Sequence, residues 1–169
     1  VQATWPRIDD ERPVVIVDID EATLAKAGQW PWPRTLLAKL LREVASAQPA
    51  AIGLDIVMPE PDRHSPDRAL EHHPNATPAL TELLSALPAN DALLAQTLRQ
   101  APTPIMLGNA GIHDTEDTPA PAPVLTPFIV DGPGEGLIPV PAYEHILRNV
   151  MPLGPAAPGH GLLLSLIHI

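Results

Sequence analysis

The feature that constrains the fold most is a strand–helix–strand pattern near the start of the chain. Residues 13–18 (Pro-Val-Val-Ile-Val-Asp) form a continuous β-branched run, which is typical of a strand buried on both faces of a parallel sheet. Apolar residues recur at helical spacing over residues 36–45, so they predict an amphipathic helix. Residues 51–57 form a second aliphatic run. Because the three segments follow within about 45 residues, they predict a βαβ unit with a right-handed parallel crossover.

Further elements extend this pattern along the chain. Asp20 is placed to cap a short helix over residues 21–27, which Gly28 ends. Asn90 and Asp91 are placed to cap another helix over residues 92–100, and a strand at residues 104–108 then completes a second crossover. We also expect helices over residues 79–87 and 142–150 and a weak strand over residues 124–130. The sequence predicts an α/β fold with a mainly parallel sheet, βαβ crossovers and long proline-rich loops.

Composition excludes several classes of function. The net charge of −10 repels phosphate backbones, and only two lysines occur, so we expect no nucleic-acid partner. The chain has no cysteine, which excludes disulfides, thiolate zinc sites and cysteine nucleophiles. Its apolar tail over residues 162–169 is far shorter than the ~20 residues that cross a bilayer.

Carboxylates follow the two predicted buried strands. Asp18 and Asp20 come after the first, and Asp55 lies in the second. Ligands of parallel α/β sheets bind outside the carboxyl ends of the strands, so these acids are candidates for holding a cation or a cationic ligand. The alternative is structural: Asp20 caps a helix, and Asp18 and Asp55 accept hydrogen bonds from loop amides.

An aromatic motif lies between the two predicted strands. Trp30 and Trp32 each precede a proline, and Arg34 follows. These side chains are candidates for lining a ligand cleft, or they fill the end of the sheet while Arg34 pairs with one of the carboxylates. We identify no catalytic residue and no cofactor motif. The histidines do not have the spacing of a common metal motif, and a metal site stays undefined.

One enzyme class offers an alternative interpretation. The run that ends in Asp18-Ile19-Asp20 is similar to the opening of haloacid dehalogenase phosphatases, in which the first Asp is the nucleophile and the second is a general acid. The hydroxyl residue that those enzymes need after the second strand is absent here. Their later lysine is absent too, because Lys26 and Lys39 both come early in the chain.

The combination of these motifs resembles the type-two CHASE domain, the second class of cyclase- and histidine-kinase-associated sensory extracellular domains. The resemblance rests on residues 14–22, on Gly28-Gln29-Trp30-Pro31-Trp32-Pro33-Arg34 and on residues 51–56. Residues 91–95 and 105–108 also resemble the next helix and strand of that family, and residues 139–161 continue the likeness. Residues 59–89 follow no family pattern.

The resemblance implies a bacterial sensor rather than an enzyme. We expect a partial extracytoplasmic domain over residues 1–161, in the periplasmic part of an inner-membrane receptor that membrane helices outside this chain anchor. It implies an unidentified small-molecule or ionic signal, a cytoplasmic adenylate, guanylate or diguanylate cyclase or histidine kinase in the same polypeptide, and a domain able to form a homodimer. A structural module without a ligand is the other alternative. The tail over residues 162–169 departs from the family pattern, so we expect an incomplete domain.

Overall fold

The computed structural model describes residues 14–72, 75–112 and 145–163. The chain divides into two compact units, one over residues 1–32 and one over residues 33–169. The predicted strand over residues 124–130 lies outside the described residues. No helix in the described part of the chain combines the length and the apolar character that a membrane span requires.

The first unit contains the helix α1 (Glu21–Ala27), and its ends confirm the sequence prediction. A carboxylate oxygen of Asp20 accepts hydrogen bonds from the backbone N–H of Thr23 at 2.8 Å and from its hydroxyl at 2.5 Å. These bonds lower the pKa of Asp20, the hydroxyl having the larger effect. Gly28 ends the helix with a φ of 100°, which glycine adopts at little cost.

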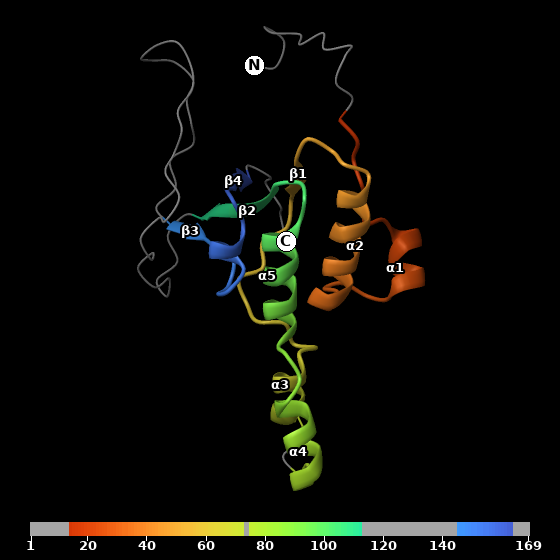
Figure 1. Cartoon of the computed structure of the whole chain (residues 1–169), viewed down its shortest axis with the longest axis vertical. Coiled ribbons are helices and arrows are strands. Elements are labelled where there is room, and N and C mark those ends of the chain that lie inside the picture. The colour runs from red at the N-terminus through yellow and green to blue at the C-terminus, as the bar shows by residue number, and fades with distance from the viewer. Residues whose placement is uncertain (1–13, 73–74, 113–144, 164–169) are drawn as a thin grey trace, which may run out of the picture. The chain divides into compact units, whose positions relative to one another are not determined.

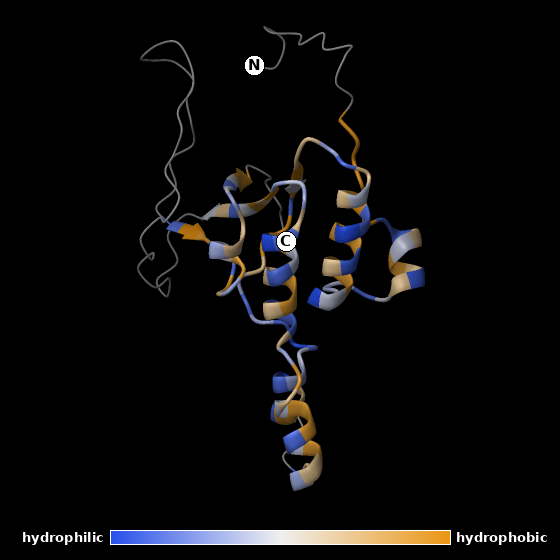
Figure 2. Cartoon of the chain, viewed as in Figure 1, coloured by the Kyte–Doolittle hydropathy of each residue, from blue (hydrophilic) through white to orange (hydrophobic). Residues whose placement is uncertain are grey.

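The buried strand predicted over residues 13–18 is not formed in its described part, residues 14–18. The first predicted crossover, which needs this strand, is therefore wrong. Residues 14–20 have no regular secondary structure, and Val14 and Ile16 are 89% and 84% exposed. This segment is the orange stretch that leads into α1 in Figure 2. A β-branched run becomes a strand only when a neighbouring strand hydrogen-bonds with it, and no described strand pairs with residues 14–20.

The second unit is built on two helices, α2 (Arg34–Ser46) and α5 (Asn90–Gln100), which pack against each other (Figure 1). The predicted periodicity of α2 is confirmed, because Leu37, Leu41 and Ala45 are buried at helical spacing. Beyond Ser46 the chain turns at Gln48, whose φ of 55° lies in the left-handed region.

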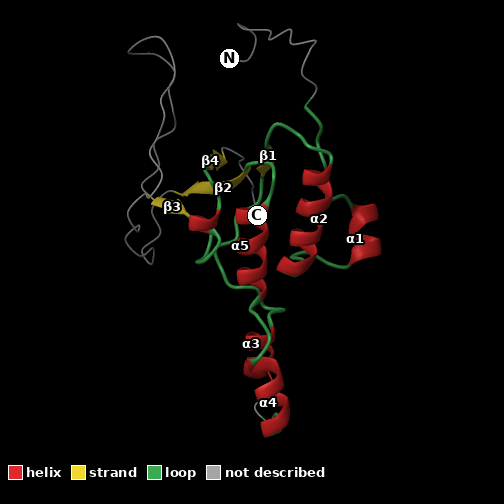
Figure 3. Cartoon of the chain, in the orientation of Figure 1, coloured by secondary structure: helices red, strands yellow, loops and turns green. Residues whose placement is uncertain are grey.

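The sheet of the second unit has β2 at its centre, and its strands appear in yellow in Figure 3. Both β1 and β4 run parallel to β2, whereas β3 runs antiparallel. Leu107 pairs with both β1 and β4, and Ala110 pairs with both β3 and β4. Since a residue has one partner on each side, β1 and β3 share one edge of β2 and β4 occupies the other. The strands are β1 (Ile52–Leu54), β2 (Ile105–Ile112), β3 (His145–Leu147) and β4 (His160–Leu163).

Alternation along β2 identifies the core face of the sheet. Ile105 and Leu107 are almost fully buried, whereas Met106 between them is 36% exposed. Leucines from both long helices complete the core together with these two residues. The mainly parallel sheet of the predicted α/β fold is thus confirmed, including the crossover that joins β1 to β2 through α5.

The long connection between β1 and α5 contains three short helices. They are α3 (Pro66–Ala69), the 3-10 helix η2 (Leu70–His72) and α4 (Pro78–Ser85), and α4 confirms the helix predicted there. Another 3-10 helix, η3 (Gly154–Ala156), precedes β4.

The helix predicted over residues 142–150 is wrong in its described part, where β3 occupies residues 145–147. Ile146 lies opposite Gly111 of β2 in the antiparallel ladder. Pairing with a distant strand has therefore overridden the local helical pattern.

Candidate functional site

Both long helices begin without a conventional cap. The N-cap residue of α2 is Pro33 and that of α5 is Ala89, and neither has a side-chain acceptor. The first N–H groups of an α-helix have no partner inside the helix, so buried helix starts need acceptors from elsewhere. The prediction that Asn90 and Asp91 cap α5 is therefore wrong, because both residues already lie inside the helix.

One turn of chain after β1 caps both helices. A carboxylate oxygen of Asp62 accepts the backbone N–H of Arg34 at 2.7 Å, from 28 residues along the chain. The hydroxyl oxygen of Ser65 accepts the backbone N–H of Asn90 at 2.9 Å. The turn is closed by the N–H of Ser65 donating to the carbonyl of Asp62. All four residues are buried, so two helix starts depend on the same short turn.

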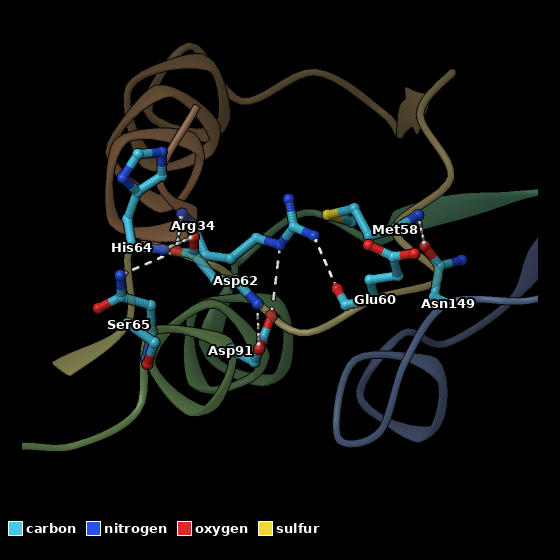
Figure 4. A network of polar contacts seen from close by, with 9 residues as sticks. Arg34, Met58, Glu60, Asp62, His64, Ser65, Asp91 and Asn149 are labelled. Carbon is cyan, nitrogen blue, oxygen red and sulfur yellow. Dashed lines mark hydrogen bonds and ion pairs between the residues drawn. The ribbon is translucent and has the colours of Figure 1, made fainter. Parts of the chain in front are cut away.

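A buried ion pair joins the two helix starts directly. The Nε of Arg34 donates to one carboxylate oxygen of Asp91 at 3.3 Å, and their side chains are 8% and 9% exposed. The other oxygen of Asp91 accepts the backbone N–H of Asp62 at 2.9 Å. Nη2 of Arg34 donates to the carbonyl of Glu60 at 3.1 Å. Figure 4 shows these contacts, and we call Arg34, Asp62, Ser65, Asn90 and Asp91 the capping cluster.

The hydrogen bonds of Asp62 favour the ionised form of its carboxyl group. Burial raises the pKa of this carboxyl group, but the backbone N–H groups of Arg34 and His64, the side-chain amide of Asn90 and the positive charge of Arg34 together lower it below 3.8. The carboxylate form is therefore favoured in the folded protein.

A second set of buried hydrogen bonds, around Asn149, lies beside the capping cluster (Figure 4). The side chain of Asn149 accepts the backbone N–H of Met58 at 2.9 Å and donates to the carbonyl of Gly108 at 2.8 Å. The backbone N–H of Val150 donates to the carbonyl of Met58 at 2.7 Å. Asn149 thus links the chain after β1 to the middle of β2, where it satisfies buried backbone groups.

The capping cluster is built to hold helices. All four carboxylate oxygens of Asp62 and Asp91 accept hydrogen bonds from the protein itself. A metal ion would have to displace these N–H donors from the carboxylates. Within the described ranges no group of three His, Cys, Asp or Glu side chains is arranged to hold a metal ion.

The acidic residues predicted from the sequence have different environments. Asp20 caps α1, whereas Asp18 and Asp55 are both exposed and make no side-chain hydrogen bond with other described residues. The carboxylate that pairs with Arg34 is that of Asp91. The predicted ligand site at Asp18, Asp20 and Asp55 stays a prediction.

The two tryptophans contact each other within the first unit. Their ring centroids are 6.1 Å apart with the planes tilted by 56°. Trp32 is 4% exposed, and its indole N–H donates to the carbonyl of Gly28 at 2.8 Å, whereas Trp30 is 39% exposed. A buried indole with its N–H satisfied is typical of a packing residue. Whether either ring contacts a ligand stays a prediction.

Sequence reasoning missed Asp62, Ser65 and Asn149. They lie in loops without a motif, and their partners are 25 to 91 residues away. One signal was available, since Pro33 and Ala89 precede two strong helices and cannot cap them with a side chain. Acceptors had to come from another part of the chain.

Comparison with known families gives one decisive result. The family described as the CHASE2 domain matches residues 1–163 of the 169 in this chain. The chain belongs to the CHASE2 domain family. CHASE2 domains are sensory extracellular domains. Comparisons with curated proteins and with solved structures gave no match.

The Trp-Pro-Trp-Pro-Arg motif of this CHASE2 domain lies where its two units meet in the sequence. Trp32 is the last residue of the first unit and Pro33 is the first residue of the second. Arg34, which ends the motif, is the central residue of the capping cluster. In this CHASE2 domain the conspicuous arginine therefore has a scaffolding role.

Proposed function

We propose that this CHASE2 domain is the periplasmic sensory part of a bacterial inner-membrane receptor. The proposal places membrane helices on either side of the domain and a cyclase, diguanylate cyclase or kinase on the cytoplasmic side. The observation that carries it is the family match over residues 1–163, since the family consists of sensory extracellular domains.

The geometry of the acidic residues does not favour the phosphatase alternative. The phosphatase alternative needs an aspartate nucleophile at the end of a strand, and residues 14–20 form no strand. Asp20, the proposed general acid, is occupied as the cap of α1. The carboxylates of the capping cluster are occupied in the same way. A general acid or base must be free to reach a substrate.

The absence of cysteine from the chain allows a direct test of the proposed location. Ser85→Cys places a thiol at an exposed position at the end of α4. Ala95→Cys is the matched control, because Ala95 in α5 is fully buried. Each variant is made in the full-length receptor and treated with a membrane-impermeant maleimide in intact cells, with the unmodified receptor as background.

We expect Ser85→Cys to react in intact cells as completely as in lysed cells. Ala95→Cys should react only after denaturation. Reaction of Ser85→Cys only after the inner membrane is broken would place the domain in the cytoplasm and contradict the proposal.

A further inference from the structure

A groove runs between the two packed helices α2 and α5, from Thr35 near the start of α2 to Ser46 at its end. Its volume is about 580 Å³, which lies within the range of small-molecule sites. Apolar side chains, among them Ala38, Ala45 and Leu93, form part of its lining. The polar side chains that line it are Thr35, Arg42, Ser46, Gln96, Thr97 and Gln100.

Arg42 is exposed at the groove, and one hydrogen bond anchors its guanidinium group. Its Nη1 donates to the hydroxyl oxygen of Thr97 at 3.0 Å. The same hydroxyl donates to the carbonyl of Leu93 at 3.1 Å, so its single proton is used and it faces Arg42 as an acceptor. Thr97 is only 7% exposed, which fixes this contact.

The remaining edge of the Arg42 guanidinium is available to a ligand. In the described part of the chain Arg42 makes no other hydrogen bond and no ion pair. Its Nε and Nη2 donors lie side by side, and this edge matches the two oxygens of a carboxylate or phosphate. An exposed cation with one arm anchored loses less side-chain freedom on binding than a fully mobile one.

Among the described residues that line the groove, Arg42 is the one charged side chain, so the lining is positive although the whole chain is acidic. The chain carries a net charge of −10, and Arg34 and Asp91 neutralise each other. The remaining charged residues of the two helices are Lys39, Arg42 and Arg99 against Glu43 alone. The positive charge of Arg42 in this lining attracts small anions.

We propose that the groove between α2 and α5 binds a small organic oxyanion, a carboxylate or phosphate on a partly apolar body, with Arg42 as its anchor. The neutral amides and hydroxyls of the groove contact the rest of the ligand, and the alanines contact its apolar part. The role of this ligand as a receptor signal rests on the proposed function, whereas its binding to the groove does not. Because α2 and α5 are joined at their starts by Arg34 and Asp91, a ligand farther along changes how the two helices pack.

The test uses benzoate, succinate and inorganic phosphate as probes, each against sodium chloride at equal ionic strength. Binding is followed by ¹⁵N NMR through the Nε–H of Arg42 and the side-chain amides of Gln96 and Gln100. The variants are Arg42→Gln, which removes charge and donors, and Arg42→Lys, which keeps the charge without the paired donors. Arg99→Gln is the matched control, since Arg99 is an exposed cation of α5 that does not line the groove.

We expect at least one probe to give saturable shifts at these groups in the wild-type chain. Arg42→Gln should weaken that binding at least tenfold and Arg42→Lys to an intermediate degree, whereas Arg99→Gln should stay within about twofold. The proposal is overturned if no probe shifts the Gln96 and Gln100 amide signals of the wild type more than those of Arg42→Gln, or if Arg42→Gln and Arg99→Gln weaken binding equally. If Arg42→Gln does not fold, Arg42→Lys decides the case. Wild-type affinity in Arg42→Lys would then overturn the proposal. Cytoplasmic labelling of Ser85→Cys would refute the proposed function and leave this binding result standing.

Discussion

Replacing Asp91 by asparagine tests the capping cluster most sharply. The two oxygens of Asp91 accept from different donors, Nε of Arg34 and the N–H of Asp62. An asparagine has only one oxygen, so in either orientation its NH₂ group faces one of these donors. Arg34 then loses its ion-pair partner in a buried position, and the carboxylate of Asp62 remains as the negative charge near it. Breaking a buried pair in this way costs about 3–5 kcal/mol, and the 3.3 Å distance favours the lower end.

The measurement is the free energy of unfolding in urea, with an exposed ion pair as the control. A loss of 3–5 kcal/mol lowers the urea midpoint by roughly 1–3 M. Glu71→Gln breaks the pair between Arg68 and Glu71, whose side chains are 37% and 56% exposed, and should cost under about 1 kcal/mol. The reasoning is refuted if Asp91→Asn costs less than about 1 kcal/mol, or no more than Glu71→Gln.

Three further variants probe the same scaffold. Ser65→Ala removes the cap of α5 and should lower the free energy of unfolding by about 1 kcal/mol in urea, and no change beyond that of exposed Ser85→Ala would argue against the cap. Asp62 has a lowered pKa in the folded state, so its contribution is complete above pH 3.8 and is lost as the pH falls through the lowered pKa. The free energy of unfolding of Asp62→Asn should therefore fall less steeply with decreasing pH than that of the wild type. An equally steep fall in the variant and the wild type would refute this. Gln48 has a φ of 55°, a conformation that glycine adopts at lower cost. Gln48→Gly should therefore raise the free energy of unfolding by roughly 0.5–1 kcal/mol and, with it, the melting temperature. An unchanged or lower melting temperature would count against strain at this position.

The helices could be predicted from the sequence because their signals are local. Asp20 and Gly28 mark the ends of α1, and the leucine periodicity marks α2. The strands were predicted less well because a strand exists only through its partner. Val14 and Ile16 have the composition of a strand but no described neighbour, whereas β3 forms within a predicted helix.

The candidate site divides in the same way. Arg34 was identified because it belongs to a conspicuous motif, but its partners Asp62 and Asp91 are 28 and 57 residues away. Only the fold brings these three residues together. The groove beside Arg42 also depends on the packing of α2 against α5, which no local pattern encodes.

The proposed function requires this sensory domain to influence the output domain of the same receptor. The most direct measurement is the activity of the full-length receptor in membranes, followed as cyclic-nucleotide synthesis or autophosphorylation according to the output domain it carries. Ser65→Ala weakens the cap of α5 without removing the core, and Ser85→Ala is its control at an exposed serine. The account predicts that Ser65→Ala changes output activity several-fold while Ser85→Ala leaves it at the wild-type level. Equal output from the wild type and both variants would contradict it.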